Sequence, residues 1–139
     1  MTDDPERALA LEPHRDDPLT LSRNVVQIMD MLQLYQAEVA RILGLQCADV
    51  AHLAQARTRL MPQTHAWRQA CLLVRCYAAL YARYQGDNVA MYHWLHRDLP
   101  GLGASPHRLM VDDHALADVV AHLERPRQMQ ALESWTGDA

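Results

Sequence analysis

From residue 19 onward, apolar residues recur at the three- and four-residue spacing of amphipathic helices. The first stripe occupies positions i, i+3, i+4 and i+7, at Val25, Ile28, Met29 and Leu32. Ser22 stands just before this stripe and is expected to cap its helix. No segment shows the sustained apolar–polar alternation that is typical of strands. The pattern predicts an all-α fold of about six or seven helices.

Glycine and proline residues indicate where the next helices end, because glycine favours a helix C-terminus and proline cannot continue a helix. The predicted helices, each followed by its terminating residue, are 36–43 with Gly44, 47–61 with Pro62, and about 65–84 with Gly86. The last of these is the longest helix expected in the chain. Its Cys71 and Cys76 are predicted to be buried or half-buried thiols rather than a reactive pair.

The C-terminal part of the chain is expected to contain shorter helices. Asp87 or Asn88 can cap a helix that runs up to the break at 100–103, and Ser105 followed by Pro106 is a typical start for a single turn. The final helix is expected to begin at Asp112 or Asp113 and to end at Pro126. Its predicted inward side chains are Leu116, Val119, Val120 and Leu123.

The segment 36–50 has the residue order of a helix-turn-helix. A small residue, Ala40, allows close packing, Gly44 suits the sharp turn, and Leu45 and Val50 supply apolar contacts. A compact helical hairpin without DNA affinity would show the same pattern. If the second helix reads DNA, its polar face and the residues after it are the candidates: Gln46, Asp49, His52, Gln55, Arg57 and Arg59.

Charge and composition narrow the function classes. The 139-residue chain has a net charge of −4, and all 13 basic residues are arginines. The acidic excess lies in the arm 1–18, so the remaining chain is close to neutral and gives little support for general nucleic-acid affinity. The three cysteines lack CxxC spacing, which favours reduced thiols. With no apolar run of membrane-spanning length and no secretory signal, a cytoplasmic protein that does not contact membranes is expected.

Histidines gather towards the C-terminal half, where His93 and His96 lie three positions apart and His107 and His114 follow. No cysteine accompanies them, and such a pair is more typical of a helix surface than of a zinc site. The chain also lacks a Ser–His–Asp order, a P-loop and a dinucleotide fingerprint. We therefore expect no metal, no cofactor and no catalytic residues.

The stretch from Trp94 to Leu123 combines a large aromatic residue, a glycine break and a proline-started turn. Such features are typical of a protein-docking module, although Trp94 could equally fill a core. Together with Ile42-Leu43-Gly44-Leu45, the motifs Gly86-Asp87, Trp94-Leu95, Leu102-Gly103, Pro106 and Leu109-Met110 make the chain resemble the Xre/MbcA/ParS antitoxin family. The resemblance covers roughly three quarters of the chain, with departures at Ala104, Ala115 and Pro126.

This resemblance implies an antitoxin of a type II toxin–antitoxin system, itself without enzymatic activity, that dimerises and neutralises a RES-domain toxin that consumes NAD. It also implies a helix-turn-helix-like region at 19–62, a toxin-binding domain at 63–126 and a tail at 127–139. The implied toxin contacts are Trp94, Leu95, Leu102, Gly103, Pro106, Arg108, Leu109, Met110, Arg125 and Arg127. Many family members bind their own promoter, which makes operator DNA a second expected partner.

The sequence also fits other classes of protein. A helix-turn-helix transcriptional regulator without a toxin is the main alternative, followed by a small metalloprotein and a stand-alone interaction module. The acidic arm is expected to be a solvated segment, with partner docking or autoinhibition as alternatives. For dimerisation, the candidate surface is the long helix around Tyr77, Leu80, Tyr81 and Tyr84, which a monomer could equally use for its core.

Overall fold

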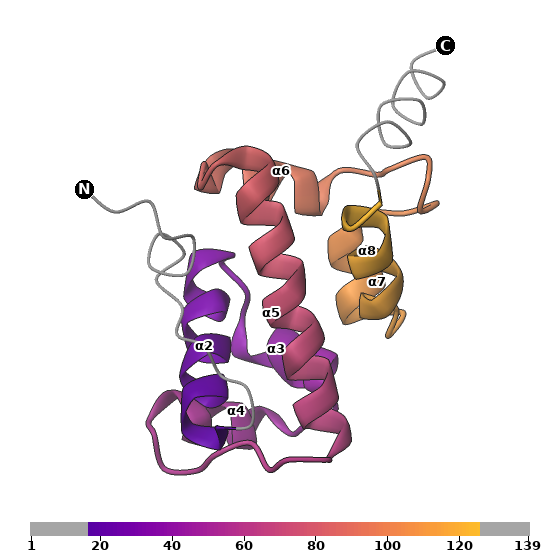
Figure 1. Cartoon of the computed structure of the whole chain (residues 1–139). Coiled ribbons are helices and arrows are strands. Elements are labelled where there is room, and N and C mark those ends of the chain that lie inside the picture. The colour runs from indigo at the N-terminus through magenta and orange to yellow at the C-terminus, as the bar shows by residue number, and fades with distance from the viewer. Residues whose placement is uncertain (1–16, 126–139) are drawn as a thin grey trace, which may run out of the picture.

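A computed structural model describes residues 17–125, and within them the chain is helical, with one isolated bridge between Leu99 and Ala104. The helices are α2 (Pro18–Met31), α3 (Gln36–Leu43), α4 (Cys47–Ala54), α5 (His65–Tyr84), α6 (Asn88–His96), α7 (Pro106–Val111) and α8 (Leu116–Leu123). These seven helices confirm the predicted all-α class (Figure 1).

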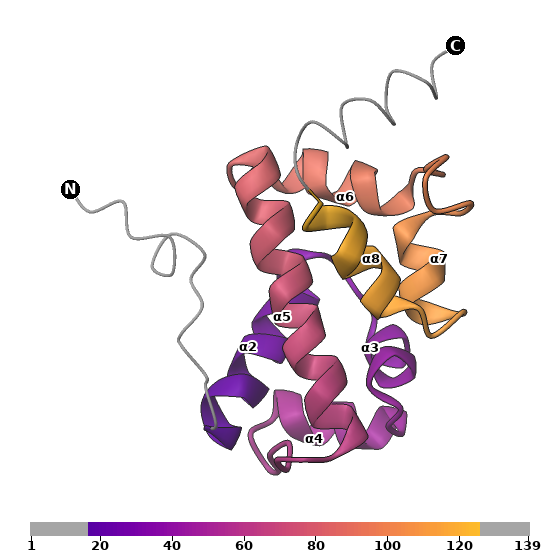
Figure 2. The same cartoon turned by 45° about the vertical axis from the view of Figure 1, so that its right-hand side comes forward.

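The 20-residue helix α5 is the centre of the fold. It packs against α2 and α3 on one side and against α6 and α8 on another, as Figures 1 and 2 show. Its buried residues belong to one continuous apolar cluster with the other helices: Ala66, Trp67, Ala70, Leu73, Cys76, Tyr77 and Leu80. Residues 19–62 and 63–125 therefore share one apolar core.

The N-terminus of α2 differs from the expectation. Asp17 is the N-cap, its side chain accepts a hydrogen bond from the Leu19 N–H, and Pro18 takes the first helical position. The prediction that Ser22 caps this helix was wrong, because Asp17 provides an earlier cap. Ser22 instead lies inside the helix, where only 3% of its surface is exposed.

Helix α4 ends at Ala54, well before Pro62, so the predicted end of this helix was also wrong. Ala56 adopts a left-handed conformation with φ of 58°. The Arg57 N–H then bonds to the His52 carbonyl at 2.8 Å, and the Ala56 N–H bonds to the Leu53 carbonyl at 3.1 Å. This pair of bonds satisfies the last carbonyls of the helix and stops it.

The prediction that Asp112 or Asp113 caps α8 was wrong, since the N-cap residue is Ala115. The N–H groups of both aspartates bond back to the Arg108 carbonyl, at 2.8 and 3.2 Å, and so finish α7. The predicted inward residues of α8 are all buried: Leu116, Val119, Val120 and Leu123. Helix α8 ends at Leu123, and Pro126, the predicted terminator, lies outside the described residues.

Candidate functional site

Helices α3 and α4 form a compact helical hairpin, the arrangement that the predicted helix-turn-helix requires. Gly44 adopts φ of 72°, the left-handed conformation that the sharp turn requires, and Leu45 and Gln46 complete the connection. Ala40 and Val50 are 5% and 1% exposed, so the two helices pack closely through the residues expected from the sequence. Gly44 therefore occupies the position that the sequence assigned to it.

Most of the candidate DNA-contacting side chains lie on the surface. Gln46, His52, Gln55, Arg57 and Arg59 are exposed. Asp49 instead stabilises the start of α4, because its carboxylate accepts the Gln46 backbone N–H at 3.1 Å and caps the helix.

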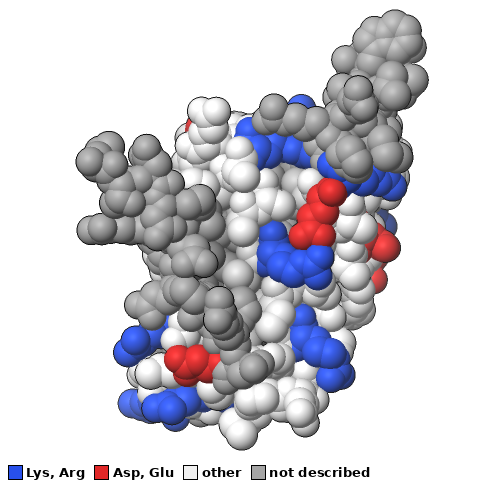
Figure 3. All heavy atoms as spheres, viewed as in Figure 1, with Lys and Arg blue, Asp and Glu red and all other residues white. Residues whose placement is uncertain are grey.

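The described arginines do not form a continuous basic surface on the face that Figure 3 presents. There the arginines stand in separate groups with uncharged surface between them, and acidic side chains adjoin some of them. Two of the described arginines are also paired with acidic side chains: Arg41 contacts Asp112 at 2.7 Å, and Arg75 contacts Glu124 through two hydrogen bonds. Such pairing lowers the positive charge available to a polyanion.

The C-terminal candidate residues divide into buried and accessible groups. Trp94, Leu95 and Met110 are at most 3% exposed, and Pro106 is also buried. The Trp94 ring lies 5.7 Å below the Arg83 guanidinium and packs in the apolar cluster. These four residues hold α6 and α7 in place and do not reach a partner in this conformation.

The accessible candidates surround α7. Gly103 and Arg108 are exposed, Leu102, Leu109 and Arg125 are half-buried, and Arg127 lies outside the described residues. The turn that carries the first of these is closed by Leu99 and Ala104, whose N–H and carbonyl bond at 3.2 Å. A partner would therefore meet a firmly supported turn and one face of α7.

A polar cluster joins α3, α6 and α7. The His107 imidazole Nε2 lies 2.6 Å from the Glu38 carboxylate, with both side chains about one-fifth exposed. The His107 ring stacks on His96 with 4.4 Å between ring centres, and His96 packs on Tyr92 at 4.3 Å. Burial lowers the pKa of His96, and the neighbouring His107 and His93 act in the same direction, while Glu38 opposes them. We call Glu38, His96 and His107 the junction cluster.

The sequence did not predict the junction cluster, because Glu38 and His107 are 69 positions apart. The two histidines stood out only as metal candidates. Among the residues of known placement, no group of three or more His, Cys, Asp or Glu side chains is arranged to hold a metal ion. Locally, Glu38 has only the position of a helix-capping residue. Its other carboxylate oxygen accepts the Tyr35 N–H at 2.9 Å at the start of α3.

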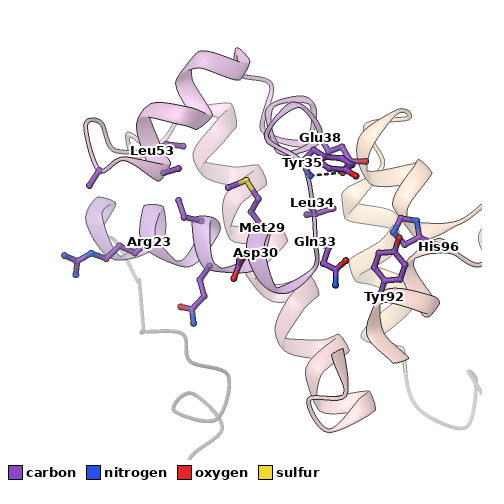
Figure 4. A pocket seen from close by; sticks show the side chains of 14 residues that line it. Arg23, Met29, Asp30, Gln33, Leu34, Tyr35, Glu38, Leu53, Tyr92 and His96 are labelled. Carbon is purple, nitrogen blue, oxygen red and sulfur yellow. Dashed lines mark hydrogen bonds between the residues drawn. The ribbon is translucent and has the colours of Figure 1, made fainter. Parts of the chain in front are cut away.

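A groove of about 780 Å³ runs beside the junction cluster between α2 and α6 (Figure 4). Its floor is apolar, with Met29, Leu34 and Leu53, and the Tyr92 and His96 side chains stand at one end. Arg23 lies at the other end. The groove therefore borders helices α3 and α4 as well as helix α6.

The candidate dimer surface on α5 is largely internal. Tyr77 and Leu80 are fully buried, as the alternative of a core role for this part of the helix predicts. They face inward because α5 is covered on several sides. Tyr81 and Tyr84 are half-buried. The cysteine prediction is confirmed, with Cys71 half-buried and Cys76 buried.

The chain matches no protein-family model and no curated protein sequence. Among the helices of residues 17–125, none combines the length and the hydropathy needed to cross a membrane.

Proposed function

We propose that this protein is an antitoxin that binds and sterically neutralises a RES-domain, NAD-consuming toxin. The observation that carries this proposal is that buried residues anchor α7 while one face of the helix stays accessible. Buried Trp94 and Met110 anchor α6 and α7 in the apolar cluster, while Arg108 and Leu109 remain available to a partner. Rigid presentation of this kind lowers the entropic cost of binding a protein partner.

The inhibition we propose is occlusion of the NAD pocket of the toxin. A guanidinium group binds phosphate through two parallel hydrogen bonds, so an arginine on this face can imitate contacts to the pyrophosphate. Arg108 and Arg125 are the candidates among the described residues, with Arg127 beyond them. The antitoxin supplies no catalytic group or cofactor of its own, and acts in the cytoplasm as a homodimer.

Purification of the tagged chain from its native cells at moderate salt, followed by mass spectrometry, tests this proposal. We expect one stoichiometric companion whose NAD consumption appears only after the chain is removed. R108A should weaken inhibition at least tenfold, whereas R23A, an exposed arginine substitution on α2, should leave it unchanged. A chain that purifies alone, or a companion without NAD-consuming activity, would refute the antitoxin role.

A helix-turn-helix regulator without a toxin is the second candidate. The exposed polar side chains on and after α4, Gln46, His52 and Gln55, favour it. This function predicts a salt-sensitive mobility shift of the promoter fragment of its own gene, lost in Q46A/H52A and retained in the control Q85A. Absence of any shift at low salt would exclude it.

A further inference from the structure

The junction cluster connects the two parts of the molecule through titratable groups. Glu38 belongs to α3, in the helix-turn-helix, whereas His96 and His107 belong to α6 and α7 in the C-terminal region. The carboxylate of Glu38 is shared, because one oxygen accepts the Tyr35 N–H and the other contacts His107. The cluster therefore joins the start of α3 to the C-terminal helices.

Two stacked imidazoles respond to protons differently from two apolar rings. One charged imidazole beside Glu38 forms an ion pair, which favours the observed arrangement. A second positive charge at a ring-centre distance of 4.4 Å repels the first. Solvent weakens this repulsion only in part, because His96 is exposed but His107 is about one-fifth exposed. The stacked geometry is therefore less favourable with two charged rings than with one.

Glu38 supplies the negative charge that acts on His96 within the cluster. On α6 the neighbours of His96 are His93 and the Tyr92 ring, and neither is a carboxylate. On α3, Arg41 is occupied by Asp112 of α7. The remaining charged groups that line the groove with His96 are Arg23, Asp30 and Glu38.

We propose that Glu38, His96 and His107 form a proton-sensitive contact between the helix-turn-helix and the C-terminal helices. The contact is closed while at most one imidazole is charged and opens when both are. Opening releases the His96 ring from His107 at the end of α6, where His96 borders the groove, while the buried core keeps the helices in place. The cluster thereby makes the surface at this end of the groove sensitive to pH.

Nuclear magnetic resonance of the full chain tests the proposal directly. At pH 7.5 we expect a cross-peak between the ring protons of His96 and His107, and we expect it to disappear at the pH where both rings have titrated. His52, which is exposed on α4, supplies the reference titration. If the cross-peak persists when both rings are charged, the proposal is wrong.

Two variants separate charge from packing. H96F keeps a stacked ring that cannot be protonated, so amide exchange at the end of α6 should become independent of pH between 7.5 and 5, after correction for intrinsic rates. H107Q keeps a donor for Glu38 but removes the second charge, and the pKa of His96 should rise. In H52Q, the matched control, the pH dependence of amide exchange at the end of α6 should equal that of the parent. Equal pH dependence in H96F and the parent would overturn the proposal.

Discussion

The Ser22 hydroxyl of α2 accepts a hydrogen bond of 2.9 Å from the backbone N–H of Leu60, 38 positions further along the chain. The same hydroxyl donates to the Pro18 carbonyl at 2.7 Å. Ser22 thus ties the loop before α5 to the inner side of α2, in a buried position.

S22A should destabilise the fold, because it leaves the Leu60 N–H buried without an acceptor. Loss of such a partner costs about 1–3 kcal/mol. Urea unfolding followed by circular dichroism measures the change, with T58A as an exposed control expected to stay within about 0.5 kcal/mol of the parent. A free energy of unfolding equal to that of the control would show that the loop finds another acceptor.

Y77F should leave the free energy of unfolding unchanged or raise it by up to about 1 kcal/mol. The Tyr77 hydroxyl is buried and has no hydrogen-bond partner among the described residues, and burial raises the pKa of this group. Removing a buried polar atom without a partner also removes its desolvation cost. Y92F, at the rim of the groove, is the comparison. Destabilisation of Y77F by more than about 1 kcal/mol would indicate that the hydroxyl is bonded after all.

G44A and G103A separate backbone strain from crowding. Both glycines have positive φ, 72° and 78°, so alanine at either position should cost about 1–2 kcal/mol. At Gly44 a Cβ would also lie 3.0 Å from the His65 ring, whereas nothing lies within 4 Å of a Cβ at Gly103. Thermal unfolding should therefore show a larger loss for G44A. The reverse order would contradict the described turn between α3 and α4.

Cysteine labelling should be selective. Cys47 is exposed, while burial, reinforced by Glu124, raises the pKa of Cys76 to about 12. Since the thiolate is the nucleophile, iodoacetamide at pH 8 should modify Cys47 rapidly and leave Cys76 unmodified in the folded protein. All three cysteines should react in guanidinium chloride. Equal rates at Cys47 and Cys76 without denaturant would mean that α5 opens readily.

Acid should weaken the fold through His96. Its pKa is lower in the folded protein than the ordinary value of 6.5, chiefly through burial. Between these two pKa values the unfolded chain binds more protons, so the free energy of unfolding should fall as the pH drops through 6.5 and the folded-state pKa. Denaturant titrations between pH 7.5 and 5 give the free energy of unfolding at each pH, and this free energy should change less with pH in H96F than in the parent. An unchanged slope would assign the acid sensitivity to other groups.

Local sequence signals predicted much of the fold. Gly44 ends α3, and α5 occupies the range given by its apolar stripe, because both features depend on neighbouring residues. The cap at Ser22 was misassigned although the correct signal is local, because Asp17 followed by Pro18 provides an earlier helix start. The buried bond between Ser22 and Leu60, in contrast, joins residues far apart in the chain, and no local pattern reveals it.

The candidate site was less predictable. Tryptophan is a common docking anchor, yet a large aromatic residue fills a core equally well, and Trp94 lies buried in the core. The contact between Glu38 and His107 requires the packing of α3 on α7, which residue spacing along a helix cannot report. Among the predicted toxin contacts, Gly103 and Arg108 are exposed, as their predicted role requires.

The central position of α5 also has a consequence for synthesis on the ribosome. Helices α2 and α3 bury their apolar faces on α5, so they cannot complete their core until the chain has been made to Tyr84 and has left the exit tunnel. Helix α8, which covers another side of α5, arrives last and closes the core. A nascent chain stalled after α4 should therefore expose apolar surface to chaperones, and protection should appear only once α5 has emerged.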